Sequence, residues 1–253
     1  KNMFKNCKKL RKVVISPSVT YIDSSAFEGC ENLREITIPS SVKYIGPRAF
    51  EGCQTLEIVN EGEVNRIFYK CQTIKHVIIP SSVTRINNYA FEDASSIEQI
   101  TIASSVTMIG KAAFIGCTRL KELIIPPLLT FIDEFTFCQC ESLVKMIIPS
   151  SVTKIGKGAF KLCTSLTEIE LPSSLVEIDD FAFLRCKKLK DISLPSSLKR
   201  IGMNAFVKCK SLTKMEVPSS ITTIERNTFR SCKSLKNISI PSSIVCISEG
   251  SFE

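Results

Sequence analysis

The sequence has little of what most enzymes and integral membrane proteins use. It holds a single histidine, His76, among 253 residues. A lone histidine is far more common as a solvated side chain than as a general base, so we expect no enzyme. No apolar run approaches the roughly 20 residues that a helix needs to span a bilayer. We therefore expect no transmembrane segment, and no signal peptide is visible.

What the chain does have is a repeat. Phenylalanine returns every 23 residues, with one interval of 18. Self-similarity at a period of 20 to 50 residues is the signature of a solenoid, in which each coil contacts only its neighbours. We expect one elongated domain over residues 1–253, with an irregular short coil near 54–68. The repeating positions are Phe4, Phe27, Phe50, Phe68, Phe91, Phe114, Phe137, Phe160, Phe183, Phe206, Phe229 and Phe252.

Each repeat contains one clear strand. Leu166–Leu171 reads L-x-x-I-x-L, the alternation of a half-buried strand. Pro172 then ends the strand, because proline cannot donate to a ladder, and a Ser-Ser pair suits a turn. A second apolar pair at 175–178 precedes Phe183 and Cys186, which we expect to fill the interior opposite the strand. The predicted fold is a solenoid of about eleven coils, with a parallel β ladder on one face and irregular or short helical segments opposite.

Twelve cysteines could indicate a disulfide framework, but ten of them form a column three residues after the phenylalanine. Ala94 fills the gap in this column, which marks a small buried apolar position. Stacked neighbours lie about 4.8 Å apart, whereas disulfide Cβ atoms lie about 3.8 Å apart. We therefore expect reduced thiols, and a straight column excludes tetrahedral zinc. Cys138 and Cys246 lie off the column and are expected to be the more reactive thiols.

Three segments carry a family resemblance: IPSSVTKIGKGAFKLCTSL at 148–166, LPSSLKRIGMNAFVKCKSL at 194–212 and VPSSITTIERNTFRSCKSL at 217–235. They resemble the BspA-like, or Treponema-type, leucine-rich-repeat family, and the resemblance covers essentially the whole chain. It implies a leucine-rich-repeat solenoid, no catalytic residues, no cofactor, and a role in adhesion to host proteins at a cell surface. The segments 54–66 and 126–131 depart from the pattern, so we expect an irregular ladder there.

The sequence also leads to expectations about the length of the whole protein and about where it acts. Both ends of the sequence fall inside a repeat, so we expect a fragment of a longer protein. The resemblance favours a cell-surface or secreted adhesin that binds a host or matrix protein. The alternative is a cytoplasmic scaffold that organises a cytoskeletal or signalling partner.

The outward strand positions give one candidate binding site. Most of them are polar, as a solvated face should be, but Ile78, Ile124 and Ile147 are not. An apolar centre within a polar rim is typical of a protein-binding patch, although β-branched residues also simply suit strands. The predicted partner-binding residues on the strand face are His76, Ile78, Glu122, Ile124, Lys145 and Ile147.

Charge gives a second candidate. Of the net charge of +8, the segment 185–236 carries thirteen Lys or Arg against three acidic residues. We expect an anion-binding ridge for an anionic glycan or acidic surface, unless these lysines only solvate the flank. Aromatic residues are too sparse among them for a base-stacking platform, so we expect no specific nucleic acid. The predicted ridge residues are Lys187, Lys188, Lys210 and Lys233.

Overall fold

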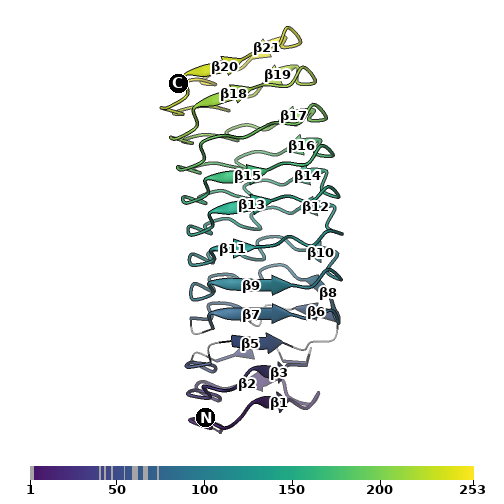
Figure 1. Ribbon diagram of the computed structural model, residues 1–253, viewed down its shortest axis with the longest axis vertical. Coiled ribbons are helices and arrows are strands. Elements are labelled where there is room, and N and C mark those ends of the chain that lie inside the picture. The colour runs from purple at the N-terminus through teal and green to yellow at the C-terminus, as the bar shows by residue number, and fades with distance from the viewer. Residues whose placement is uncertain are drawn as a thin grey trace.

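The protein is a stack of coils along one axis, with its N-terminus at one end and its C-terminus at the other (Figure 1). This computed structural model describes residues 3–39, 41–42, 44–46, 48–53, 55–58, 62–64, 68–72 and 74–253. Each regular coil contributes two short strands, and equivalent strands of neighbouring coils pair in parallel. One continuous apolar core runs through the stack from Ile15 to Phe229.

The first ladder is formed by the predicted strands. In the regular coils it pairs residues 23 positions apart, for example Lys12 with Glu35 and Lys145 with Glu168. Its strands are β1 (Lys12–Val14), β3 (Glu35–Thr37), β5 (Thr55–Ile58), β7 (His76–Ile79), β9 (Gln99–Ile102), β11 (Glu122–Leu123), β13 (Lys145–Ile147), β15 (Glu168–Glu170), β18 (Lys214–Glu216) and β20 (Asn237–Ser239).

A second ladder follows the Pro-Ser-Ser turn, where the sequence shows only an apolar pair. It also pairs in parallel, as in Phe131 with Lys154. Its strands are β2 (Tyr21–Ile22), β4 (Tyr44–Ile45), β6 (Gly62–Val64), β8 (Val83–Ile86), β10 (Met108–Ile109), β12 (Phe131–Ile132), β14 (Lys154–Ile155), β16 (Glu177–Ile178), β17 (Arg200–Ile201), β19 (Thr223–Ile224) and β21 (Cys246–Ile247).

Two details of the predicted architecture need correction. The helical segments expected opposite the strand ladder are absent from the described residues, which show the second ladder and turns instead. Left-handed residues explain this: Ser25 (φ 57°) and Gly29 (φ 74°), four positions apart, would each interrupt a right-handed helix, and most coils repeat the pair. The expected eleven coils are also slightly too many. The chain makes about nine regular turns of about 23 residues, and the short coil near 54–68, which the prediction counted as a full one, is among those that are irregular.

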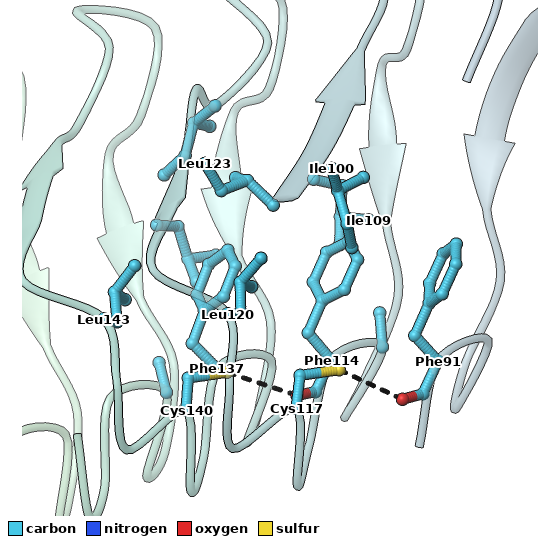
Figure 2. Close-up of a cluster of buried hydrophobic side chains, with 14 of the residues drawn as sticks. Phe91, Ile100, Ile109, Phe114, Cys117, Leu120, Leu123, Phe137, Cys140 and Leu143 are labelled. Atoms are coloured by element: carbon cyan, nitrogen blue, oxygen red, sulfur yellow. Dashed lines mark hydrogen bonds between the residues drawn. The ribbon is translucent and has the colours of Figure 1, made fainter. Parts of the chain in front are cut away.

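The phenylalanine column forms the interior. On either side of the short coil, consecutive rings stack with centroids 4.9 to 5.7 Å apart and nearly parallel planes. Figure 2 shows Phe91, Phe114 and Phe137 in one such row, with Leu120 and Leu143 beside them. Both faces of a ring are therefore covered by the coils before and after it, which is why one coil cannot fold alone.

The cysteine column has a hydrogen-bonding role. Cys117 Sγ donates to the Phe91 carbonyl at 3.2 Å, and Cys140 Sγ donates to the Phe114 carbonyl at 3.3 Å (Figure 2). Each thiol thus adds a second donor to a carbonyl of the preceding coil that already accepts an amide N–H of its own turn, as Phe91 O does from Ala94 N. The same bond, at 3.0 to 3.6 Å, is made by Cys30, Cys53, Cys163, Cys186, Cys209 and Cys232.

The two cysteines outside the column behave differently from each other. Cys246 is exposed, as a reactive thiol must be. Cys138 is buried, and its burial raises the pKa of the thiol to about 11. A buried thiol with a raised pKa holds little reactive thiolate. The prediction of a reactive thiol is therefore wrong for Cys138.

The second serine of the Pro-Ser-Ser turn also joins coils. Its hydroxyl donates to a carbonyl 22 residues earlier, as Ser151 Oγ does to Leu129 O at 2.6 Å. These serines therefore satisfy backbone acceptors between coils as well as forming turns. Equivalent bonds are made by Ser41, Ser105, Ser174, Ser197, Ser220 and Ser243.

Glycines allow the closest approach between coils. Gly156 is buried against the Asp133–Glu134 turn of the preceding coil, where a Cβ atom would lie 2.8 Å from the Ile132 carbonyl oxygen. Gly46, Gly110 and Gly202 sit in the same column, and each lies over an Asp or Asn turn of the coil before. From Asn87 to Gly202 the column alternates strictly between an Asx residue and glycine.

The irregular short coil produces a step in the first ladder. Glu57 pairs with Glu35 on one side and with Ile78 on the other, whereas an unbroken repeat would place Glu35 and His76 in one column. The ladder therefore shifts by two residues at β5, in agreement with the irregularity expected there. Asn60 and Glu61, part of the segment that replaces the usual turn, lie outside the described residues.

Candidate binding surfaces

The first ladder breaks between β11 and β13. One ladder runs from β1 to β11, and the next begins with the separate pair β13 and β15. Strand β11 has only two residues, so Ile124 and Ile125 lie outside it. The Pro126-Pro127 pair follows directly, and two prolines fix the backbone of this turn and remove a hydrogen-bond donor. The ladder is thus irregular next to 126–131, as the sequence predicts.

A groove of about 560 Å³ lies at this break, lined by residues of β9, β11, β13 and the segments that follow them. Its most exposed apolar side chains are Ile124, at 85%, and Ile147, at 56%. Gln99, Thr101, Glu122 and Lys145 form the polar part of the lining. An exposed apolar centre with polar neighbours is the arrangement of a protein-binding patch.

The rim of the groove carries more negative than positive charge. Lys145 Nζ lies 2.9 Å from a Glu170 oxygen and 3.4 Å from a Glu168 oxygen. The hydrogen bond to Glu170, with its charge, raises the pKa of Lys145. Glu122 makes no ion pair among the described residues. Two carboxylates of the next coil therefore contact the Lys145 ammonium group, and Glu122 adds a third carboxylate to the lining. The groove thus has an acidic rim around its isoleucines.

The other two predicted residues lie apart from this groove. His76 and Ile78 are on β7, both half-buried, and neither lines the groove. His76 Nδ1 lies 3.3 Å from Oε1 of Gln99, an ordinary contact between neighbouring coils. The structure thus brings together Glu122, Ile124, Lys145 and Ile147, but not the β7 pair.

Sequence reasoning left two features of this face out of the candidate site. Strand register places Val14, on β1, at an outward position, and at 69% exposure it is a further apolar residue of this face. The groove itself also includes Gln99, Thr101 and Pro149. The signal for the groove was the double proline at 126–127, which predicted an irregular ladder but not which residues would line the opening.

The four ridge lysines all project into solvent from turns that follow column cysteines. Adjacent coils are close here: the Phe183 and Phe206 rings are 5.2 Å apart, and the Phe206 and Phe229 rings 5.6 Å. Within the described residues, no ion pair involves Lys187, Lys188, Lys210 or Lys233. Several lysines elsewhere are paired with a carboxylate one coil away, as in Lys111 with Glu134 at 2.7 Å.

Across the described part of the chain, no group of three His, Cys, Asp or Glu side chains could hold a metal ion. The same residues contain no helix of the length and apolar character that crossing a bilayer requires.

Among curated proteins, none matches the chain. Solved structures do. A leucine-rich repeat protein from Eubacterium ventriosum is 22% identical over 97% of this chain and 83% of its own, with a TM-score of 0.59. A leucine rich cell surface protein from Faecalibacterium prausnitzii is 28% identical, covering 92% of this chain and 80% of its own, with a TM-score of 0.49. A leucine-rich repeat protein from Bacteroides ovatus is 26% identical, covering 94% and 82%, with a TM-score of 0.46.

The first of these structures supports the fold, and the family model supports the family. The model of the BspA type leucine rich repeat region matches residues 1–67, 62–167 and 153–253, in six copies. These ranges take in the stacked phenylalanines, the thiol bonds and both ladders described above. The chain belongs to the BspA-type leucine-rich-repeat family.

Proposed function

We propose that this chain is a non-enzymatic recognition module whose groove at the ladder break binds an extended segment of a partner protein. Leucine-rich-repeat proteins of this family are typically non-catalytic, and such repeats serve as protein-interaction modules. The observation that carries the proposal is the groove with Ile124 and Ile147 exposed at its centre.

The groove favours a particular partner chemistry. Covering both isoleucines would contribute roughly 1.5–3 kcal/mol for each side chain removed from water. Ile124 and Ile125 lie outside the ladder, so their main chain can pair with an extended peptide, as in strand addition. The acidic rim favours Lys or Arg beside the apolar residue of that peptide. The partner segment is therefore extended, with an apolar side chain flanked by basic ones.

The test compares two variants of the chain. Ile124→Ser with Ile147→Ser removes the apolar centre, while Val14→Ser removes an equally exposed apolar residue of the same face on β1. Binding of synthetic peptides, with leucine flanked by lysines or by glutamates, is followed by fluorescence anisotropy at low and high salt. We expect the lysine-flanked peptide to bind the parent chain and the Val14 variant, and to bind the double variant at least ten-fold more weakly.

Two results would count against this function. Equal binding of the glutamate-flanked peptide would remove the role of the acidic rim. Equal binding by the double variant would show that the groove is not the site. Circular dichroism and the urea midpoint of each variant establish that the solenoid remains folded, because both isoleucines are exposed and contribute little to the core.

The proposal includes the compartment in which the chain acts. The family resemblance supports a cell-surface or secreted adhesin that binds a host or matrix protein, and an intracellular scaffold is the second candidate. Immunofluorescence with an antibody raised against the chain, on cells that produce the protein, distinguishes the adhesin from the scaffold. Labelling of intact cells supports the adhesin, whereas labelling only after permeabilisation supports the scaffold.

A further inference from the structure

We propose that the C-terminal coils carry a second, independent binding site, the lysine ridge (Lys187, Lys188, Lys210 and Lys233), and that its ligand is a linear sulfated polysaccharide. The ridge lies in the turns after the cysteine column rather than at the ladder break. It therefore neither depends on the groove nor shares residues with it.

The ridge is held in register by the fold. Ser211 N donates to the Lys187 carbonyl at 3.1 Å, which joins two of the turns directly. The phenylalanines of the same coils stack at 5.2 and 5.6 Å. Lys187, Lys210 and Lys233 occupy one column of the repeat, so three positive charges recur along the axis at close to this spacing. A ligand that follows the axis meets one charge per coil.

The same column shows what happens when a carboxylate is available. At the other end of the solenoid it holds Lys8 and Glu31, whose charged groups lie 2.9 Å apart. In the ridge the next coil offers lysine instead of glutamate. Like charges carried by neighbouring coils repel one another, and no carboxylate among the described residues pairs with these lysines. A bound polyanion would remove this repulsion and release its own counterions.

The neighbourhood of the ridge selects among polyanions. In the turns 185–190, 208–213 and 231–236, no large apolar side chain is exposed. Within these turns, bases of single-stranded nucleic acid would find no aromatic side chain on which to stack. Phe252, which is 43% exposed, lines a hollow with Lys233, but a single ring can neither stack the successive bases of a strand along three coils nor anchor a membrane. The exposed groups are ammonium, guanidinium and hydroxyl groups, which suit sulfates and sugar hydroxyls. Arg185, Lys190 and Lys208 extend the positive field on both sides.

The experiment measures binding of a size-defined heparin oligosaccharide by titration calorimetry over a series of salt concentrations. Lys187→Ala with Lys210→Ala and Lys233→Ala should weaken binding at least ten-fold and flatten its dependence on salt. The charge-conserving triple Arg variant should bind like the parent chain. The matched control changes Lys8, Lys111 and Lys154 to Ala, which removes the same charge from lysines that are paired with carboxylates.

The variants test where the ligand binds, and the competing ligands test which polyanion is bound. Unchanged binding by the triple Ala variant, or an equal loss in the matched control, overturns the ridge as the site. Desulfated heparin, single-stranded DNA of equal charge, and vesicles containing phosphatidylserine serve as competing ligands. The sulfated oligosaccharide should bind at least ten-fold more tightly than each. Equal binding of DNA or vesicles overturns the polysaccharide assignment, and the groove variants should leave all these values unchanged.

Discussion

Changing Gly156 to alanine should force two coils apart. The new Cβ atom would lie 2.8 Å from the Ile132 carbonyl oxygen, 2.9 Å from the Asp133 carbonyl carbon and 3.0 Å from the Glu134 nitrogen. All three are backbone atoms, so no side chain can rotate away, and the coils must separate by roughly half an ångström to reach ordinary contact distance. The hydrogen bond from Gly156 N to Ile132 O, at 2.8 Å, would lengthen with them.

The expected loss is about 2 kcal/mol. Overpacking a well-packed core typically costs about 1–3 kcal/mol, and a backbone hydrogen bond contributes about 1 kcal/mol. Urea unfolding followed by circular dichroism measures the change. Glu225 occupies the same column and already has a Cβ atom, so Glu225→Ala should change stability by less than about 0.5 kcal/mol. A loss below that value for Gly156→Ala would refute the close approach of the coils.

Other predictions concern thiols, acid stability and backbone strain. Iodoacetamide should alkylate the exposed Cys246 in the native protein, but the buried Cys138 only after unfolding, as peptide mass spectrometry would show. Burial opposes ionisation of Asp179, but hydrogen bonds from Arg200, the following amide and a lysine outweigh it and lower its pKa. This contribution is present above about pH 4 and is lost as pH falls through the lowered value. The destabilisation by Arg200→Met, measured by urea unfolding, should therefore shrink in acid, and a constant difference would contradict it. The exposed Gln139 has φ 62°, so Gln139→Gly should stabilise by about 0.5–1 kcal/mol, whereas Gln139→Ala should not.

The sequence predicted the repeating architecture because the spacing of equivalent residues along the chain is enough to show it. A phenylalanine every 23 residues, a cysteine three positions later and a strand pattern between them fix the stack and the parallel ladder. The second ladder was missed because the sequence there shows only an apolar pair, as at Leu175 and Ile178, and not the longer alternation of the first ladder. Left-handed turn residues such as Ser25 have no required residue type, so the sequence did not exclude a helix.

Only part of the candidate site could be predicted from the sequence, and the reason is geometric. Outward positions follow from strand register, so Ile124 and Ile147 could be named as neighbours on one face. The groove between them depends on where the ladder opens, which is a property of two coils together. The two-residue step at β5 likewise depends on pairing across coils. The burial of Cys138 depends on how the coils pack together. Its position outside the cysteine column in the sequence does not reveal that burial.

The alternation of Asx and glycine between Asn87 and Gly202 sets the unit by which this chain can change length. Removing one coil would place two Asx turns, or two glycines, in neighbouring coils. The close fit of a glycine over an Asx turn would then be lost at that point. Removing or duplicating two coils together, about 46 residues, preserves every such contact. Viable shortened or lengthened forms in this region should therefore differ by pairs of coils, which makes the coil pair the natural module for both gene duplication and redesign.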